Sequence, residues 1–411
     1  MKLSESPGES FLSTPVRLRT VAPNEERTYA LGMQVSGLFA GVGGLESGLA
    51  AAGHKTLAVA EIFPPACAVL DARFDAPNLG DVTKLLAIPG DTELLTAGFP
   101  CQDLSQAGRT AGIDGEKSGL VNAVFSLLDR QPTPWVLLEN VSFMLRLDGG
   151  LAMTRLVSEF EERGYRWAYR VINSLSFVPQ RRERVFFLAS KVGEPSEVLF
   201  GEDTAAQIAP TALRDRAHGF YWTEGVRGLG WASDAVPTLK IGSSVGIPSP
   251  PAIVMPNGAV ITPDIRDAER LQGLPEDWTL PAETVARSSR RWTLVGNAVT
   301  APAAHWLGEK LLSPVAYDRG QDSAFGRRWP NAARFDGKDR YAVRSGAYPV
   351  WRPRAPLAEF LRHPGKPLSA RATSGFLSRT QRSSLRFPPG FLEAMAIHLA
   401  DISDARAAIA A

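Results

Sequence analysis

The chain is poor in cysteine and has no long apolar run. Its 411 residues include two cysteines, Cys67 and Cys101, too few for a disulfide framework and not spaced as the CxxC pair that binds zinc. No apolar stretch approaches the roughly 18 to 20 residues that span a bilayer, and the first residues do not resemble a secretory leader. We therefore expect a cytoplasmic protein without a membrane partner, in which a reactive thiol stays reduced.

The net charge is only +2, but it is unevenly distributed. From Pro314 to Ala411 there are 16 Lys and Arg against 8 Asp and Glu, whereas the preceding residues have 29 against 35. A basic, arginine-rich segment is typical of contact with phosphates, and it is also typical of a solvated surface. Charge alone leaves both interpretations open.

Apolar strand-like runs alternate with segments of helical period from about residue 35 onward. This alternation predicts an α/β fold with a doubly wound, mostly parallel sheet. We expect strands at 35–39, 56–60, 93–97, 135–139, 170–172 and 184–189, and helices at 44–52, 65–73, 118–129 and 153–163.

The alternation stops after residue 190. Residues 191–264 are rich in Gly and Pro with scattered aromatics and predict a smaller, irregular domain. Helical patterning returns at 267–274 and 299–312, and the last hundred residues look irregular until a helix at 391–399. We therefore divide the chain into a loose leader (1–30), an α/β domain (31–190), an irregular domain (191–264), a segment that returns to the α/β domain (265–313) and a basic C-terminal extension (314–411).

Cys101 is the first candidate for chemistry. It follows the strand-like run Leu94–Ala97, and Pro100 stiffens the backbone just before it. Parallel sheets place reactive groups outside the carboxyl ends of their strands. A free cysteine taken alone is more often buried and inert, so the case for a nucleophile depends on the rest of the chain.

A glycine-rich turn follows the first expected strand. Phe39 precedes Gly41 and Gly43, which let the backbone approach a ligand at the start of a helix. Glu61 follows the second strand, where such folds place an acid that binds ribose hydroxyls. Asp81 ends the next segment and either meets an adenine amine or is a solvated loop residue. The spacing differs from the GxGxxG of dinucleotide binders, so we expect an adenosine-type cofactor other than NAD.

Further charged side chains follow later strands. Glu139 ends an apolar run; partly desolvated, it would have a raised pKa and could donate a proton, or it could simply complement a helix dipole. Gln180, Arg182 and Arg184 alternate along an extended segment and therefore face one side. Two guanidiniums on one face can grip a phosphate, an anionic intermediate or a carbonyl oxygen, or they can form a surface salt-bridge cluster.

Taken together and in this order, these segments resemble the DNA cytosine-5 methyltransferases. The resemblance runs from about Val35 to Leu312 and leaves out the tail after Pro314. Six blocks match the family's motifs: the S-adenosylmethionine turn at 38–44, the Pro-Cys motif at 98–101, the Glu-Asn-Val motif at 139–141, the QxRxR motif at 180–184 and the closing motifs at 270–273 and 296–299.

The resemblance implies methyl transfer from S-adenosylmethionine to C5 of a flipped-out cytosine in a specific short duplex DNA sequence. Cys101 would attack cytosine C6 and form a covalent intermediate, because C5 is too weakly nucleophilic to be methylated directly. Glu139 would engage N3 and the exocyclic amine, and Arg184 would approach O2. Gln180 and Arg182 would hold the loop that carries Cys101.

The resemblance also assigns a cofactor pocket around the glycine turn. Phe39 would stack on the adenine, Glu61 would bind the ribose hydroxyls and Asp81 would contact the adenine amine. Ile62 stands where the family often has an aromatic residue and would pack on the adenine more weakly. The backbone at the turn and residues of other segments would complete the cofactor and base pockets: Gly41, Gly43, Pro100, Leu120, Asn297 and Val299.

For DNA contact, the resemblance makes residues 191–264 the target-recognition domain. Thr238, in a Thr-Leu element, would hold the backbone of the flipped nucleotide, while Arg227 and Lys240 are candidates for reading guanine edges. Arg109 and Lys117 lie in a glycine-containing segment that would act as a mobile lid and contact phosphates.

We therefore expect a monomeric DNA (cytosine-5)-methyltransferase that acts on double-stranded DNA and is paired in function with a restriction endonuclease. One alternative is a tRNA cytosine-5 methyltransferase on the same scaffold, which a comparison of DNA and tRNA substrates would separate. A second is a non-catalytic DNA-binding protein that retains the fold. A small-molecule methyltransferase would leave the QxRxR motif and residues 191–264 unexplained.

Overall fold

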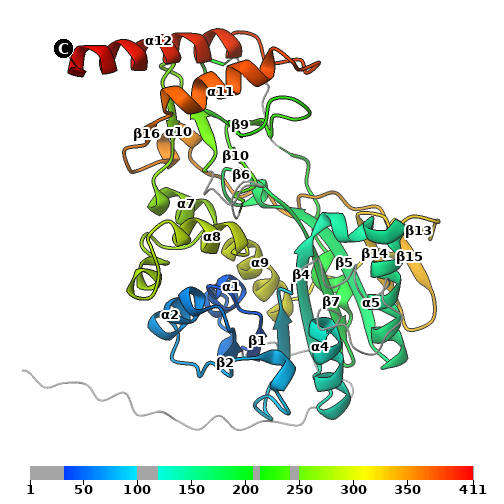
Figure 1. Ribbon diagram of the computed structural model, residues 1–411. Coiled ribbons are helices and arrows are strands. Elements are labelled where there is room, and N and C mark those ends of the chain that lie inside the picture. The colour runs from blue at the N-terminus through cyan, green and yellow to red at the C-terminus, as the bar shows by residue number, and fades with distance from the viewer. Residues whose placement is uncertain (1–31, 100–118, 207–212, 241–249, 411) are drawn as a thin grey trace, which may run out of the picture. The chain divides into compact units, whose positions relative to one another are not determined.

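A nine-stranded sheet is the largest element of the computed structural model, which describes residues 32–99, 119–206, 213–240 and 250–410 (Figure 1). Its strands are β1 (Gln34–Leu38), β2 (Lys55–Ala60), β3 (Leu94–Ala97), β4 (Trp135–Val141), β5 (Arg166–Asn173), β7 (Glu183–Ser190), β13 (Asp322–Ala324), β14 (Ala332–Phe335) and β15 (Arg340–Val343). They lie in the order β13-β15-β14-β5-β7-β4-β3-β1-β2.

This sheet is mixed rather than mostly parallel, which corrects the expectation from the sequence. The pairings among β2, β1, β3 and β4 are parallel, but β7 runs antiparallel to both β4 and β5. Only residues 174–182 separate β5 from β7. A link of this length joins neighbouring antiparallel strands, whereas a parallel pair requires a crossover of a dozen or more residues.

Helices cover both faces of the sheet. On one face, α4 (Gly119–Arg130) and α5 (Leu151–Glu162) pack their apolar sides against the sheet, with Phe125 and Phe160 in one buried cluster with Trp167. On the other face, α1 (Gly44–Ala51), α6 (Pro195–Leu199) and α9 (Ala301–Leu312) form a second cluster. Both faces of the sheet are therefore shielded from solvent.

A smaller, five-stranded sheet contains most of the strands of the irregular domain. Its order is β16-β12-β11-β8-β9, and its strands are β8 (His218–Phe220), β9 (Ala232–Ser233), β11 (Ala252–Val254), β12 (Val260–Thr262) and β16 (Lys366–Pro367). Every pairing in it is antiparallel. Such short strands interrupted by Gly and Pro carry little periodic signal, so the sequence did not predict them.

The described part of the C-terminal extension joins both sheets. Strands β13, β14 and β15 extend the large sheet beyond β5, and β16 pairs with β12 of the small sheet. Two helices, α11 (Ala370–Thr380) and α12 (Phe391–Ala410), supply Phe376 and Phe391 to the core of the small sheet around Phe220. The extension is therefore not irregular up to residue 391, whereas the domain boundaries remain predictions.

Shorter elements connect these parts. A two-stranded sheet pairs β6 (Gln180–Arg181) with β10 (Val236–Pro237). The remaining helices are α2 (Pro64–Arg73), α7 (Ile265–Leu271), α8 (Arg290–Asn297) and α10 (Leu357–Phe360), and the 3₁₀ turns are η1 (Val82–Lys84), η2 (Ser142–Leu145), η3 (Leu147–Gly150), η4 (Ser174–Ser176), η5 (Leu280–Thr284) and η6 (Arg319–Gln321). Within the described ranges, none of the helices combines the length and apolar character needed to cross a membrane.

Candidate active site

The turn between β1 and α1 has a backbone that few residues adopt. Phe39, Gly41 and Gly43 have φ angles of 53°, 57° and 76°, and a positive φ is uncommon for a residue with a side chain. A Cβ atom on Gly41 would meet nothing within 4 Å, whereas one on Gly43 would lie 2.3 Å from the ring of Phe74. The turn therefore leaves open space beside Gly41, at the edge where β1 ends.

Glu61 closes this turn from the end of β2. Its carboxylate accepts hydrogen bonds from the backbone N–H groups of Gly41 at 2.9 Å, Ile62 at 2.8 Å and Phe63 at 2.8 Å. Asn78 holds the same segment, because its Oδ1 accepts the N–H of Glu61 at 3.0 Å. The acid after the second strand therefore lies against the glycine turn, while its binding of ribose hydroxyls stays a prediction.

The residues around the turn fit an adenosine-type cofactor. Ile62 is 66% exposed, an apolar surface beside the carboxylate of Glu61. Space is also open at Gly80, where a Cβ atom would meet nothing within 4 Å. Hydrogen bonds from Thr83 lower the pKa of Asp81, so this carboxylate is ionised and can accept hydrogen bonds from an amine.

The closing motif at 296–299 lies against the same turn. A Cβ atom on Gly44 would come within 2.7 Å of the carbonyl oxygen of Val299, so the two backbones are in close contact. Asn297 is exposed at the end of α8, and Leu120 is half-buried in the first turn of α4. The structure thus brings Val299 to the turn, while the cofactor roles of Asn297 and Leu120 stay predictions.

Glu139 is a buried carboxyl group near the end of β4. It is 7% exposed, and burial raises its pKa, although the nearby guanidiniums of Arg184 and Arg182 oppose this effect. Nε of Arg184 lies 3.1 Å from Oε1 of Glu139. The pair results from strand register, because Arg184 on β7 lies opposite Val141 on β4.

Strand register also brings the segment that leads to Cys101 beside Glu139. Ala97 of β3 lies opposite Leu138 of β4 in a parallel pair, so the two strands end at the same edge. The side-chain N–H of Asn140 donates to the carbonyl oxygen of Phe99 at 3.0 Å. Four of the residues predicted for this site, Pro100, Cys101, Arg109 and Lys117, lie outside the described residues.

Asn140 is a residue whose role the sequence analysis missed. The motif at 139–141 contains it without indicating a role. Its amide joins β4 to Phe99, which lies between β3 and Cys101. The available signal was an amide side chain directly after the candidate acid at a strand end. A buried amide in such a place usually satisfies a backbone group.

Gln180 and Arg182 are buried anchors, with 0% and 2% of their surface exposed. Gln180 donates to the carbonyl oxygen of Leu271 at 2.8 Å and accepts the N–H of Leu239 at 2.9 Å. Arg182 donates to the carbonyl oxygen of Ala298 at 2.8 Å. They therefore join the irregular domain at Leu239 to the two closing motifs, and the alternation predicted for residues 180–184 is confirmed. Their predicted contact with the Cys101 loop falls outside the described part.

Three residues that the sequence predicts to contact DNA, Thr238, Lys240 and Arg227, come later in the chain than Gln180 and Arg182. The hydroxyl of Thr238 donates to the carbonyl oxygen of Arg181 at 2.9 Å. The ammonium of Lys240 lies 3.9 Å from the centre of the Tyr221 ring and pairs with the carboxylate of Glu224. Arg227 is exposed and lines a surface hollow. The structure thus brings Thr238 to β6, beside the buried Arg182, while base reading by Arg227 and Lys240 stays a prediction.

The mixed sheet has a glycine turn at one edge, with Glu61 hydrogen-bonded to it. Glu139, a buried carboxyl, lies beside the segment that leads to Cys101. This arrangement is typical of a methyltransferase fold. Residues 33–221 match the model of the C-5 cytosine-specific DNA methylases. The Type II methyltransferase M2.BsuMI of Bacillus subtilis (strain 168) is 45% identical over 369 residues, which cover 85% of this chain and 94% of that protein. The chain therefore belongs to the C-5 cytosine-specific DNA methylase family.

Other relatives agree with this assignment. The Type II methyltransferase M.DsaV of Dactylococcopsis salina is 29% identical over 310 residues, which cover 68% of this chain and 85% of that protein. Among solved structures, the Dnmt2 methyltransferase of S. pombe has a TM-score of 0.50 at 17% identity, covering 68% of this chain and 98% of that one. The Entamoeba histolytica methyltransferase EhMeth has a TM-score of 0.51 at 12% identity, with coverage of 69% and 98%. These two structures support the fold.

Proposed function

We propose that the protein transfers a methyl group from S-adenosylmethionine to C5 of cytosine within a specific short sequence of duplex DNA. The observation that carries this proposal is the buried pair of Glu139 and Arg184, which lies beside the segment that leads to Cys101. The glycine turn and Glu61 belong to the neighbouring strands of the same sheet. Membership of the C-5 cytosine-specific DNA methylases supports the same reaction.

S-adenosylmethionine, when bound, supplies an electrophilic methyl group. Phe39, Glu61 and Asp81 would hold its adenine and ribose, and Ile62 would pack on the adenine. The open space beside Gly41 allows the close approach that these contacts need. Further contacts are assigned to Gly43, Pro100, Leu120, Asn297 and Val299.

The chain's own groups activate the cytosine. The thiolate of Cys101 adds to C6, and the electron pair of the C5–C6 double bond moves toward C5. Glu139 holds a proton at N3 and so stabilises the charge that develops on the ring, and Arg184 donates to O2. Once C5 carries the methyl group, loss of its proton returns the electron pair to the C5–C6 bond and expels the thiolate.

A stacked base cannot reach these groups, so the cytosine must leave the helix. Thr238 would hold the backbone of the flipped nucleotide, and Arg109 and Lys117 would contact phosphates from the lid. We assign catalysis to residues 31–190 and 265–313, and target recognition to residues 191–264.

The setting that we propose is a restriction-modification system in the cytoplasm. The relatives M2.BsuMI and M.DsaV are named Type II methyltransferases. In this setting the protein would act as a monomer on double-stranded DNA, and a restriction endonuclease would be its partner in function.

The test is transfer of labelled methyl groups from S-adenosylmethionine to genomic DNA of a heterologous host, followed by bisulfite sequencing. We expect methylated cytosines in one short context. Cys101→Ser should abolish methylation and leave DNA binding largely intact. Cys67→Ser is the matched control, because a hydroxyl can replace the thiol that donates to the carbonyl oxygen of Glu61 at 3.3 Å.

Each other outcome selects an alternative. Transfer to tRNA without transfer to DNA would make the protein a tRNA methyltransferase. DNA binding without transfer to either substrate would make it a non-catalytic DNA-binding protein. Full turnover by the Cys101→Ser variant would contradict the covalent mechanism.

A further inference from the structure

The turn formed by Thr223 to Gly228 is closed by its own backbone. The N–H of Gly225 donates to the carbonyl oxygen of Gly228 at 2.8 Å, and the φ of 113° at Gly225 favours glycine there. Val226 is 40% exposed at the tip, and Arg227 beside it is exposed as well. The turn thus presents one apolar and one cationic side chain to solvent.

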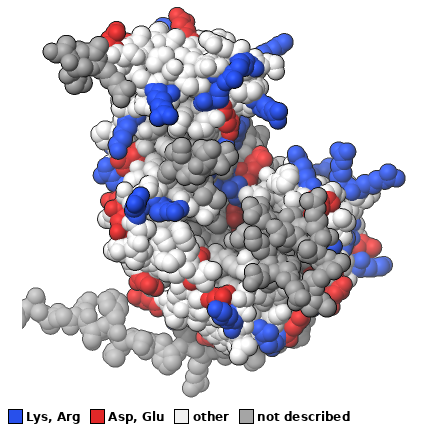
Figure 2. All heavy atoms as spheres, viewed as in Figure 1, with Lys and Arg blue, Asp and Glu red and all other residues white. Residues whose placement is uncertain are grey.

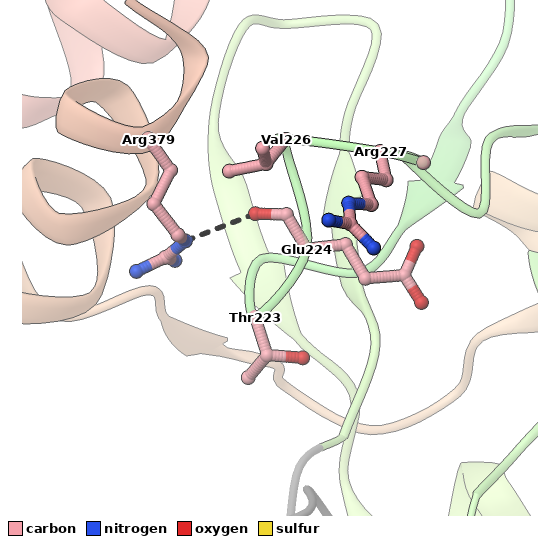
Figure 3. Close-up of a pocket in the computed structure, with 6 residues that line it drawn as sticks. Thr223, Glu224, Val226, Arg227 and Arg379 are labelled. Carbon is pink, nitrogen blue, oxygen red and sulfur yellow. Dashed lines mark hydrogen bonds between the residues drawn. The ribbon is translucent and has the colours of Figure 1, made fainter. Parts of the chain in front are cut away.

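Helix α11 of the C-terminal extension anchors this turn. Arg379 donates from Nε to the carbonyl oxygen of Glu224 at 3.0 Å (Figure 3). Its terminal nitrogen donates to the carbonyl oxygen of Trp222 at 2.6 Å. Just after the helix, the hydroxyl of Ser383 donates to the carbonyl oxygen of Val226 at 3.1 Å. Three carbonyl groups of one short segment are therefore held by residues from far along the chain.

Packing adds to these hydrogen bonds. A Cβ atom on Gly225 would lie 3.1 Å from the ring of Phe376, so the turn rests directly on α11. Phe376 is fully buried in the cluster that also contains Phe220 of β8 and Phe391 of α12. The support beneath the turn is thus part of the core of the small sheet.

The anchored turn borders an open hollow of about 450 Å³. The hollow is lined by Thr223, Glu224, Val226, Arg227, Gly228 and Arg379. Figure 3 shows the guanidinium of Arg227 directed back toward the side chain of Glu224. Arg227 is exposed beside the hollow, so its guanidinium can reach a ligand there.

A chain of contacts links this turn to β6, which precedes β7 of the candidate site. Glu224 pairs with Lys240, whose ammonium also lies over the ring of Tyr221. The hydroxyl of Tyr221 donates to the carbonyl oxygen of Thr238. Thr238 in turn donates to the carbonyl oxygen of Arg181, next to the buried Arg182.

We propose that α11 belongs to the target-recognition region and that Arg379 is a positioning residue for sequence specificity. Arg379 fixes the turn so that Arg227 reads a guanine edge in the major groove, the base contact for which an arginine is best suited. Because this assignment concerns how the DNA is read, it rests on the proposed methylation of duplex DNA.

The geometry separates Arg379 from a simple phosphate contact. Its donors serve two backbone carbonyls, and burial lowers its pKa. A planar guanidinium can bridge two such carbonyls, whereas the single ammonium of a lysine cannot do so with the same geometry. A contact that discriminates between bases needs such a rigid support, because small displacements remove its hydrogen bonds.

The experiment compares the sequence contexts methylated by the full-length wild-type protein and by Arg379→Ala and Arg227→Ala variants, using bisulfite sequencing of heterologous genomic DNA. Wild-type methylation is measured first, because its absence would refute the proposed function rather than this inference. We expect both variants to lose about tenfold or more of their discrimination at one guanine position. Arg379→Lys should share this loss.

Arg371→Ala is the matched control, since Arg371 lies on the same helix with its side chain exposed. It should keep the wild-type context whatever it does to the overall rate. If Arg379→Ala does not fold, Arg227→Ala and Ser383→Ala carry the test, because the first side chain is exposed and the second change removes one hydrogen bond. An unchanged context in the folded variants, or an equal loss at all sites, would overturn the inference.

Discussion

At the scale of single residues, Glu139 has the surroundings that best define a role. Its carboxyl is buried near a strand end, and burial raises its pKa against the opposing effect of Arg184 and Arg182. A buried carboxyl that retains a proton at higher pH than a free one suits the task of donating to N3 of cytosine.

Glu139→Gln should slow methyl transfer by about 10² or more, because an amide can form a hydrogen bond but cannot transfer a proton. In the wild type, the single-turnover rate should fall as pH rises through the raised pKa of Glu139, since the protonated form is the active one. The variant should lose this dependence. Single-turnover rates measured across pH test both points.

Glu183→Gln is the control, because Glu183 is an exposed carboxylate on the same strand as Arg184. It should leave rate and pH profile unchanged. A near-normal rate for Glu139→Gln would remove the proposed role of Glu139.

At the scale of elements, α1 packs on the large sheet through a buried acid. Glu46 is 1% exposed, and Thr96 of β3 donates to its Oε1 at 2.9 Å. Gly37 of β1 leaves the necessary room, because a Cβ atom there would lie 2.1 Å from that oxygen. Burial raises the pKa of Glu46 from 4.5 to about 7.

The free energy of unfolding should therefore fall as pH rises from 4.5 to 7. The folded state holds the proton of Glu46 more tightly than the unfolded state, so this stabilisation is complete below pH 4.5 and lost as pH passes 7. Since one pKa unit corresponds to about 1.4 kcal/mol, the change amounts to at most roughly 3.5 kcal/mol. Glu46→Gln should remove it, as urea unfolding at pH 5 and pH 7.5 would show.

The exposed Glu162 provides the control, and Glu162→Gln should keep the wild-type pH dependence of unfolding. If Glu46→Gln unfolds with the same pH dependence as the wild type, Glu46 is not the group responsible.

The first half of the fold was largely predictable at this scale. Strands β1 to β4 and the helices between them lie within a few residues of their expected positions, because apolar runs and helical periods are strong there. The antiparallel direction of β7 was not predicted, since periodicity shows neither which neighbour a strand pairs with nor in which direction. Strands β13 to β16 are short, and β14 and β16 pair with strands far away in the sequence.

The candidate site shows the same division. Alternation along residues 180–184 and the positions of Glu61 and Glu139 at strand ends could be inferred from local sequence. The hydrogen bond from Asn140 to Phe99 and the anchoring of Trp222 and Glu224 by Arg379 depend on tertiary contacts. No local pattern predicts such contacts.

At the scale of the whole molecule, the basic residues after Pro314 fall into two structural groups. Some arginines are structural, such as Arg334, which pairs with Asp322 in the large sheet. Others are exposed: Arg371, Arg382 and Arg386. Figure 2 shows Lys and Arg side chains over the part of the surface where Figure 1 draws α11 and α12.

Replacing Arg371, Arg382 and Arg386 together by Ala should weaken binding to DNA of any sequence and leave folding intact. Each lost phosphate contact should reduce the salt slope of the binding constant by about 0.9. Measuring affinity against salt concentration tests this. Removing residues 320–411 would not be a clean test, because it also removes β13 to β16 and the core residues Phe376 and Phe391.

The control triple variant replaces Arg327, Arg328 and Lys338, which are exposed residues of the same extension beside the large sheet. It should keep the wild-type salt slope. An equal decrease in the salt slope of both triple variants would show that the position of the basic residues does not matter for DNA binding.

The completion of the small sheet by α11 and α12 has a consequence during synthesis. A chain leaves the ribosome from its N-terminus, and early parts fold first. Strands β8 to β12 emerge well before Phe376, Phe391 and Met395, which fill their core. All the family motifs of the chain are therefore synthesised before the small sheet can complete its core, so in the proposed function sequence selection would be the last property to form.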